Sequence, residues 1–157
     1  MAETVWRIAR RPHALDRLGR GAREEGGRWN RPGTAVIYGG CTIAIAALEK
    51  FVHLAGVVPP DLVLVRIELP EVYSEERPGL ADLPKDWDLL PPGPSSMNFG
   101  TEWAREHRSL VLYVPSVLVR EECNTVLNPV HAEFVGVKMT IERKFLYDAR
   151  MFRRGRS

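Results

Sequence analysis

The sequence predicts an α+β fold with several strands and a few helices. Several short segments have the β-branched and aromatic content of strands, and fewer have a helical pattern. These segments do not alternate strictly between strand and helix, which argues against a doubly wound parallel sheet. With 157 residues, 45% of them hydrophobic, the chain can build one real core, so we expect a single domain over residues 1–157.

The expected elements follow one another along the chain with turn residues between them. Strands are expected at 4–9, 34–38, 62–69, 110–114 and 133–141, with a further edge strand at 145–147. Helical segments are expected at 13–18, from Thr42 within the apolar run 41–55, and at 101–107. Residues 71–96 contain five prolines and many charges, so we expect a long surface excursion with little regular structure.

Glu49 lies in the apolar run 41–55, where a carboxylate is unusual. The run leaves no wide polar stripe, so we expect its helix to be largely buried, with Glu49 on the same face as Ile45 and Ala46. An unpaired buried carboxylate costs on the order of several kcal/mol, so a cationic partner or a pocket is expected beside it. The alternative is that Glu49 ends the buried turn and faces water beside Lys50.

The segment 26–40 has the composition of a loop, a strand and a turn that lead into this helix. Glycines and a proline punctuate the loop, and Gly39 and Gly40 are expected to end the strand before the helix begins. Free N–H groups at the helix start, with Arg28 and Arg31 on the loop, would favour an anionic ligand such as a phosphate. The alternative is an ordinary connection with two solvated arginines, because the glycine and lysine pattern of the well-known phosphate loops is absent.

The charges of the chain are balanced. The 22 Lys and Arg residues against 20 Asp and Glu leave a formal net charge of +2, too small to argue for nucleic-acid binding by bulk electrostatics. Residues 150–157 form a locally basic tail, for which we expect a solvated chain end in preference to a nucleic-acid arm. No stretch of about twenty apolar residues is present and the N-terminus lacks the order of a signal peptide, so neither export nor a membrane span is expected.

Cys41 and Cys123 stand in unrelated sequence contexts, without metal-ligand spacing. The simplest interpretation is a pair of reduced thiols in a cytoplasmic protein. No cluster of His, Cys or carboxylate residues has metal-ligand spacing elsewhere in the sequence, so no metal is expected.

Two polar segments stand near the expected strand at 110–114. Ser116 follows that strand and a proline, and the segment 124–131 brings two Asn residues, a proline and His131 into an expected loop. Ordinary turn chemistry explains either segment, because short polar side chains bond nearby backbone groups. No Gly-x-Ser-x-Gly elbow accompanies Ser116, so serine hydrolase chemistry has no local support.

Several of these motifs together resemble the RES domain, a family named for an arginine, a glutamate and a serine. The resemblance runs from about Trp6 to Phe152. It rests, in chain order, on residues 26–30, 33, 36–38, 46–49, 110–116, 124 and 127–131. RES proteins are toxins of bacterial toxin–antitoxin pairs with a fold similar to that of ADP-ribosyltransferase toxins. The resemblance implies a mixed or antiparallel sheet core with a few flanking helices. Members consume NAD by hydrolysis or phosphorolysis, or transfer ADP-ribose to a protein.

The resemblance implies an NAD site on this chain, with NAD as substrate. It assigns Arg28 to the phosphates or the nicotinamide ribose, Tyr38 to stacking on the nicotinamide, and Glu49 to the ribose hydroxyl and the developing positive charge. It makes Arg7 a second phosphate ligand, for which a surface salt bridge is the alternative. Ser116 would position the ribose or orient Glu49.

The resemblance also implies a partner. This is an antitoxin with an Xre-type helix-turn-helix domain that occludes the active site, and the toxin itself is not expected to bind DNA. Three functions stay open: an NAD-degrading toxin, a protein ADP-ribosyltransferase that uses the same pocket, and a binding module without catalysis. The third would be expected to lack Arg28 or Glu49, and both are present. The sequence leaves open the acceptor of ADP-ribose and the oligomeric state, a homo-oligomer included.

Overall fold

The computed structural model describes residues 2–153, so the last part of the basic tail, residues 154–157, lies outside the described residues. Within the described range the chain forms a seven-stranded sheet in the order β4-β5-β6-β2-β1-β3-β7. Neighbouring strands are antiparallel, except that β4 and β5 are parallel. This mixed sheet with a few flanking helices confirms the predicted α+β class.

Strands and helices follow one another irregularly along the chain. The strands are β1 (Thr4–Arg10), β2 (Ile37–Gly40), β3 (Leu62–Glu68), β4 (Glu75–Glu76), β5 (Val111–Pro115), β6 (Cys123–Leu127) and β7 (Lys138–Lys144). The α-helices are α1 (Arg20–Glu25), α2 (Ile43–His53) and α3 (Pro94–Arg105). Short 3-10 helices are η1 (Arg11–His13), η2 (Leu80–Asp82), η3 (Ala132–Gly136) and η4 (Ala149–Phe152). No helix within residues 2–153 is long and apolar enough to cross a membrane.

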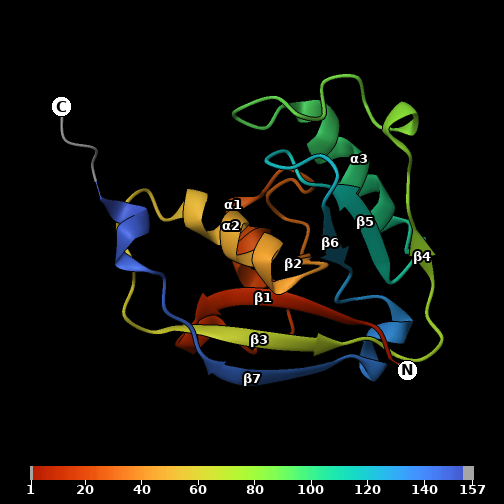
Figure 1. Cartoon of the computed structure of the whole chain (residues 1–157). Helices are drawn as coiled ribbons and strands as arrows, with labels where there is room; N and C mark the ends of the chain where they lie inside the picture. Colours follow the sequence, from red (N-terminus) through yellow and green to blue (C-terminus); the bar gives the residue numbers. More distant parts are fainter. Residues whose placement is uncertain (1, 154–157) are drawn as a thin grey trace.

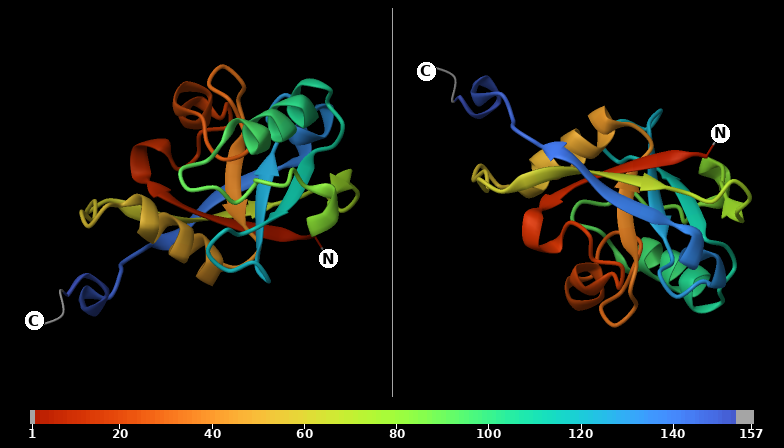
Figure 2. Two further views of the ribbon diagram at one scale, coloured as in Figure 1. Left: turned by 90° about the horizontal axis from the view of Figure 1, so that it is seen from above. Right: turned by 90° about the horizontal axis from the view of Figure 1, so that it is seen from below.

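The sheet turns sharply between β1 and β2. Figure 1 shows β1, β3 and β7 side by side, with the other strands turning away from them and α3 lying along β5. Figure 2 shows β7 at the outer margin of the sheet and η4 extending away from it. The turn leaves α2 beside β1, next to the point where the two parts of the sheet meet.

Successive apolar side chains of β5 and β6 point to opposite faces of the sheet, so both faces are buried. Leu112 and Val126 face α3 and pack with Trp103. Val111 and Leu127 face the opposite way and pack in the cluster that includes side chains of β1 and β3. Because side chains of a strand point alternately to the two faces, a strand with apolar residues at successive positions is buried on both sides.

Helix α2 begins where the sequence predicts, since Thr42 caps it by accepting the Ile45 N–H on Oγ1 at 3.1 Å. The prediction that the helix is largely buried is wrong, because Ile45 and Ala46 are the buried residues of this fully described helix. The helix lies against β1 (Figure 1), so one face meets the core and the rest is partly open. Glu49 is half-buried on it.

Strand β2 runs further than predicted, because Gly39 and Gly40 belong to the strand and do not end it. A Cβ atom at Gly39 would lie 2.9 Å from Thr125 Oγ1 and 3.1 Å from the Trp6 carbonyl oxygen. A Cβ atom at Gly40 would lie 2.8 Å from Ile45 Cγ2. The two glycines therefore allow β1, β6 and α2 to approach the strand closely.

The prediction of a loop over 124–131 is wrong in its first half, where β6 forms. This strand pairs with β2 on one side and with β5 on the other. Asn124 has little local preference for a strand, so pairing on both sides decides its conformation. The prediction for 133–141 is wrong in its first half too, since η3 forms there and β7 begins at Lys138.

The remaining differences concern the extent of elements. Helix α1 and the short strand β4 were not predicted, and α3 begins earlier than 101. The helical turn predicted at 13–18 is wrong, because η1 ends at His13 and residues 14–19 form no helix. Residues 145–147 form no strand. The segment 71–96 holds β4, η2 and the start of α3, and its Leu83 and Trp87 side chains are buried against α3. Buried anchors of this kind are not visible from proline content alone.

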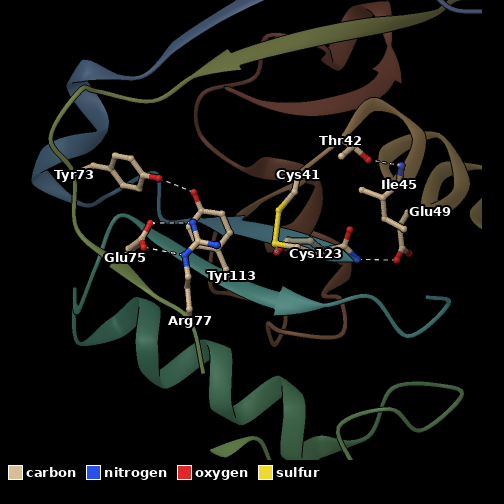
Figure 3. The surroundings of a disulfide bond; sticks show 10 residues. Cys41, Thr42, Ile45, Glu49, Tyr73, Glu75, Arg77, Tyr113 and Cys123 are labelled. Atoms are coloured by element: carbon tan, nitrogen blue, oxygen red, sulfur yellow. Dashed lines mark hydrogen bonds and ion pairs between the residues drawn. A yellow bond between two sulfur atoms is a disulfide. The ribbon is translucent and has the colours of Figure 1, made fainter. Parts of the chain in front are cut away.

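A disulfide joins Cys41 and Cys123, whose Cα atoms are 5.5 Å apart (Figure 3). The expectation of two reduced thiols is therefore wrong. Antiparallel pairing of Gly40 with Asn124 places the two cysteines opposite each other, and the Cys41 N–H donates to the Cys123 carbonyl at 3.0 Å. The two cysteines have a sequence separation of 82, so no local sequence pattern predicts this contact.

We expect reduction of the Cys41–Cys123 bond to lower stability and to leave the fold intact. The bond closes a loop with a sequence separation of 82, and such a cross-link contributes about 4 kcal/mol through the entropy of the unfolded chain. Its loss should lower the Tm by about 10 °C in a chain of this size. Thermal unfolding with and without a thiol reductant measures the shift.

The matched control is the Cys41→Ser/Cys123→Ser double variant. It should unfold at the temperature of the reduced wild type and should not respond to reductant. A wild-type Tm that reductant does not change would show that this cross-link contributes nothing to stability.

Candidate active site

The Glu49 carboxylate is held by two side chains from the neighbouring part of the sheet. Its Oε1 accepts a hydrogen bond from Ser116 Oγ and another from Asn124 Nδ2, each 2.7 Å long. Its Oε2 has no hydrogen bond within residues 2–153 and is not sealed from solvent. The sequence predicts a cationic partner or a pocket beside Glu49. Both hydrogen-bond donors are neutral, and they leave one carboxylate oxygen without a hydrogen bond.

Ser116 lies directly after β5 and is fully buried. Its Oγ accepts the N–H groups of Leu118 and Val119 at 3.1 and 3.3 Å, which closes a tight turn around the hydroxyl. A hydroxyl donates one hydrogen, and here that hydrogen points to Glu49. Of the two roles considered for Ser116, the geometry fits the orientation of Glu49.

Asn124 is the residue of the site to which sequence reasoning gave no role. It occurs in the motif order of the RES resemblance, but the segment was expected to be a loop. In β6 its side chain points to Glu49, and its Oδ1 is buried without a hydrogen-bond partner in the described part of the chain. Its role was missed because strand β6 was not predicted. Only the pairing of β6 with β2 brings Asn124 close to α2.

Arg28 lies on the loop between α1 and β2. Its Nη1 donates to the carbonyl oxygens of Trp87 and Leu89, both at 2.8 Å. Burial lowers the pKa of Arg28, and the negative charges of Glu49 and Asp88 act in the opposite direction. Arg28 therefore lies within electrostatic reach of Glu49, and it stays charged because a guanidinium does not lose its proton in proteins.

Tyr38, on β2, holds the loop that carries Arg28. The Tyr38 hydroxyl accepts the Trp29 N–H at 3.1 Å and donates to Asn30 Oδ1 at 2.5 Å. A Cβ atom at Gly27 would lie 2.7 Å from the Tyr38 hydroxyl oxygen, so the loop can cross the ring only with a glycine there. Burial raises the pKa of Tyr38, which keeps the phenol neutral.

Arg7 lies in the middle of β1 and has no hydrogen bond or ion pair in the part of the chain that the structure describes. Burial lowers the pKa of Arg7, and Asp16 acts in the opposite direction. Burial also lowers the pKa of Lys50, and the positive charges of Arg7 and Arg10 lower it further. The acidic groups that act on these two cations are Asp16 for Arg7 and Glu25 for Lys50. Neither cation forms an ion pair within residues 2–153, so the surface salt bridge considered for Arg7 does not form there.

Arg31 is not brought into this group. Its exposed side chain donates from Nε to Asn98 Oδ1 in α3, and its backbone N–H donates to Thr101 Oγ1 at 2.9 Å. These contacts tie the loop to α3. The structure thus separates the two loop arginines that the sequence placed together.

A separate cleft of about 290 Å³ opens beside β5, lined in part by Arg77, Tyr113, Arg120 and Cys123. Its arginines already have partners, since Arg77 pairs with Glu75 at 2.9 Å and Arg120 with Asp88 at 2.6 Å (Figure 3 shows the first pair). Glu49, Arg7 and Lys50 do not line this cleft. No group of three or more His, Cys, Asp or Glu side chains within residues 2–153 is placed to hold a metal ion.

Known proteins share both the sequence and the fold. The Prs ADP-ribosylating toxin of Sphingobium sp. (strain YBL2) is 43% identical over 160 residues, which cover 98% of this chain and 99% of the relative. Toxin Res of Yersinia enterocolitica is 35% identical over 149 residues, covering 92% and 95%. A chain of the M. tuberculosis MbcT–MbcA toxin–antitoxin complex superposes with a TM-score of 0.68 at 17% identity, covering 91% of this chain and 85% of that one.

The family model of the RES domain matches residues 4–148, which include every residue of the site described above. The two sequence relatives extend over nearly the whole chain at more than 30% identity. This chain therefore belongs to the RES domain family.

Proposed function

We propose that this chain is the toxin of a bacterial toxin–antitoxin pair and that it consumes NAD by cleaving the bond between nicotinamide and ribose. The observation that carries the proposal is the fixed Glu49 carboxylate, held through Oε1 by Ser116 and Asn124 with Oε2 open. The family and the toxin names of its relatives support the same function.

The chemistry requires a negative charge beside the ribose. When the bond from C1′ to the pyridinium nitrogen breaks, nicotinamide leaves with the electron pair as a neutral molecule, and the ribose ring takes up positive charge. A carboxylate that is already in place stabilises this charge without reorganisation in the transition state. Glu49 is assigned this role, and Oε2 is the oxygen that would face the ribose.

The cations are assigned to the diphosphate. Arg28 keeps its Nε and Nη2 free of hydrogen bonds within the described residues, an edge that suits bidentate contact with a phosphate. Arg7 and Lys50 would supply further positive charge from β1 and α2. Tyr38 is assigned to the nicotinamide, whose positive charge favours an aromatic face before the bond breaks.

Two classes of acceptor for ADP-ribose are compatible with this site. Water or phosphate would make the protein an NAD glycohydrolase or phosphorylase. A protein acceptor would make it an ADP-ribosyltransferase, and the 43% identical relative named Prs ADP-ribosylating toxin favours this second candidate. Nicotinamide release with and without phosphate, compared with transfer of labelled ADP-ribose to Prs and to lysate proteins, separates the two.

The Glu49→Gln variant is expected to fold normally and to lose activity. The amide fills the same volume but carries no charge, so nicotinamide release should fall by about 10³-fold. The Tm should change by no more than about 2 °C, because Glu49 is half-buried and held by neutral donors. Near wild-type turnover in this variant would remove Glu49 from the mechanism.

The Arg28→Ala variant is expected to bind NAD more weakly, with a Kd about 10- to 100-fold higher, because charged contacts to phosphate are lost. Calorimetry in the Glu49→Gln background measures the affinity without turnover. Arg31→Ala is the matched control, since Arg31 lies on the same loop but turns to Asn98 in α3. If Arg28→Ala left the NAD affinity at the wild-type value, Arg28 would be structural.

We further propose that the protein acts in the cytoplasm as a single unit over residues 1–157 and is held inactive by an Xre-type helix-turn-helix antitoxin that covers the site. An acidic side chain or chain terminus of the antitoxin would be attracted to the same cations as the diphosphate. DNA binding would belong to the complex, because the net charge of +2 gives this chain little affinity of its own.

Expression of the chain alone is therefore expected to arrest growth and to lower cellular NAD, and co-expression with its antitoxin should reverse both. Expression of the Glu49→Gln variant should do neither, which separates loss of NAD from the burden of expression. Tight DNA binding by the isolated chain, or a complex that binds NAD as well as the free chain does, would contradict the proposed mode of control.

A further inference from the structure

A short segment covers one side of the Arg28 guanidinium. This segment, residues 86–90, is called the strap. The carbonyl oxygens of Trp87 and Leu89 both accept from Arg28 Nη1 at 2.8 Å. The strap therefore fixes the direction of the guanidinium plane and leaves the edge with Nη2 for a ligand.

The strap itself has two anchors. Trp87 is buried and stacks on Trp29, with ring centroids 6.2 Å apart and planes inclined by 20°. Asp88, between the two carbonyls that hold Arg28, accepts a hydrogen bond from Arg120 Nη2 at 2.6 Å. Leu89 and Leu90 are exposed and add little packing. The second anchor of the strap is therefore an ion pair to the turn after β5.

The Asp88–Arg120 pair lies outside the proposed NAD site. The Arg120 side chain is 60% exposed and the Asp88 side chain 29% exposed. An ion pair with this exposure contributes little to global stability. It joins the strap to the turn after β5 beside the cluster in which Trp87 and Val117 pack, and the strap holds Arg28.

We propose that Arg120 is a positioning residue for NAD binding, a role that rests on the function proposed above. Its ion pair with Asp88 fixes the strap, and the strap carbonyls fix Arg28 in the orientation that binds the diphosphate. Arg120 also lies over the Trp87 ring, 6.0 Å from its centroid, so it acts on Arg28 through the strap and not by contact with the substrate. A displacement of about 1 Å in a positioned charge is enough to weaken a contact of this kind considerably.

The test compares Arg120→Ala with Arg108→Ala in the full chain. Arg108 is the matched control, because it also forms an exposed ion pair, with Glu76 at 2.6 Å, but makes no contact with the strap. Arg120→Ala should raise the KM for NAD about 5- to 10-fold and leave kcat within about twofold. Arg108→Ala should change neither, and Arg120→Lys, which keeps the cation, should recover most of the wild-type KM.

Two further measurements separate positioning from direct contact with NAD. Hydrogen exchange of residues 86–90 should speed up in Arg120→Ala and not in Arg108→Ala. In a double-mutant cycle, Asp88→Asn combined with Arg120→Ala should raise the KM no more than the stronger single variant, because both remove the same ion pair.

Each outcome decides between the alternatives. A wild-type KM in Arg120→Ala overturns the proposal, whether or not exchange changes. A raised KM without faster exchange in the strap also overturns it, because Arg120 would then contact NAD directly. If the wild-type chain neither releases nicotinamide nor binds NAD, the proposed function fails instead, while faster exchange would still show that Arg120 holds the strap.

Discussion

The two hydrogen bonds on Glu49 Oε1 are the contacts on which the rest of the site depends. Glu49 comes from α2, Ser116 from the turn after β5 and Asn124 from β6, at sequence separations of 67 and 75. The carboxylate thus has one orientation only when helix and sheet are assembled. Because its donors are neutral, the negative charge is held in place without being neutralised, which is the state that stabilises a developing cation.

The surrounding structure restricts movement of the two elements that meet at this contact. Thr42 caps α2 directly after Cys41, and Cys123 directly precedes Asn124. The disulfide therefore joins the residue before the helix cap to the residue before the amide that holds Glu49. Gly40, which tolerates no Cβ against Ile45, lets the helix start close to the sheet. Covalent, hydrogen-bonding and steric constraints act on the same few residues.

The arginines assigned to the diphosphate are held differently from Glu49. Arg28 is held by backbone carbonyls of a distant segment, and its loop is held by the hydroxyl of Tyr38 through Trp29 and Asn30. Arg7, by contrast, has no hydrogen bond or ion pair in the described part of the chain, and its attracting charge is Asp16. One arginine is oriented by the protein and the other is available to follow a ligand, a division that suits a diphosphate with two charged groups.

Local pattern was sufficient for much of the fold. The α+β class, the start of α2 at Thr42 and strands β1, β3 and β5 were predicted because alternation, capping residues and turn residues act over a few neighbouring positions. The predicted strand boundaries were wrong where tertiary packing overrides local propensity. This is the case at Gly39 and Gly40 in β2 and at the polar start of β6. The burial of α2 was overestimated because apolar composition does not reveal how many faces of a helix meet the core.

The sequence by itself determined that Glu49 is a carboxylate in an apolar helix, that Arg28 and Tyr38 precede it on a loop and a strand, and that the motif order resembles the RES domain. Only the tertiary structure decided that Asn124 holds Glu49, that Cys41 meets Cys123, and that Arg31 turns away from Arg28 to α3. The reason is physical. Each of these contacts depends on which segments become neighbours across the sheet, and strand order is set by burial of the whole core, which no local pattern contains.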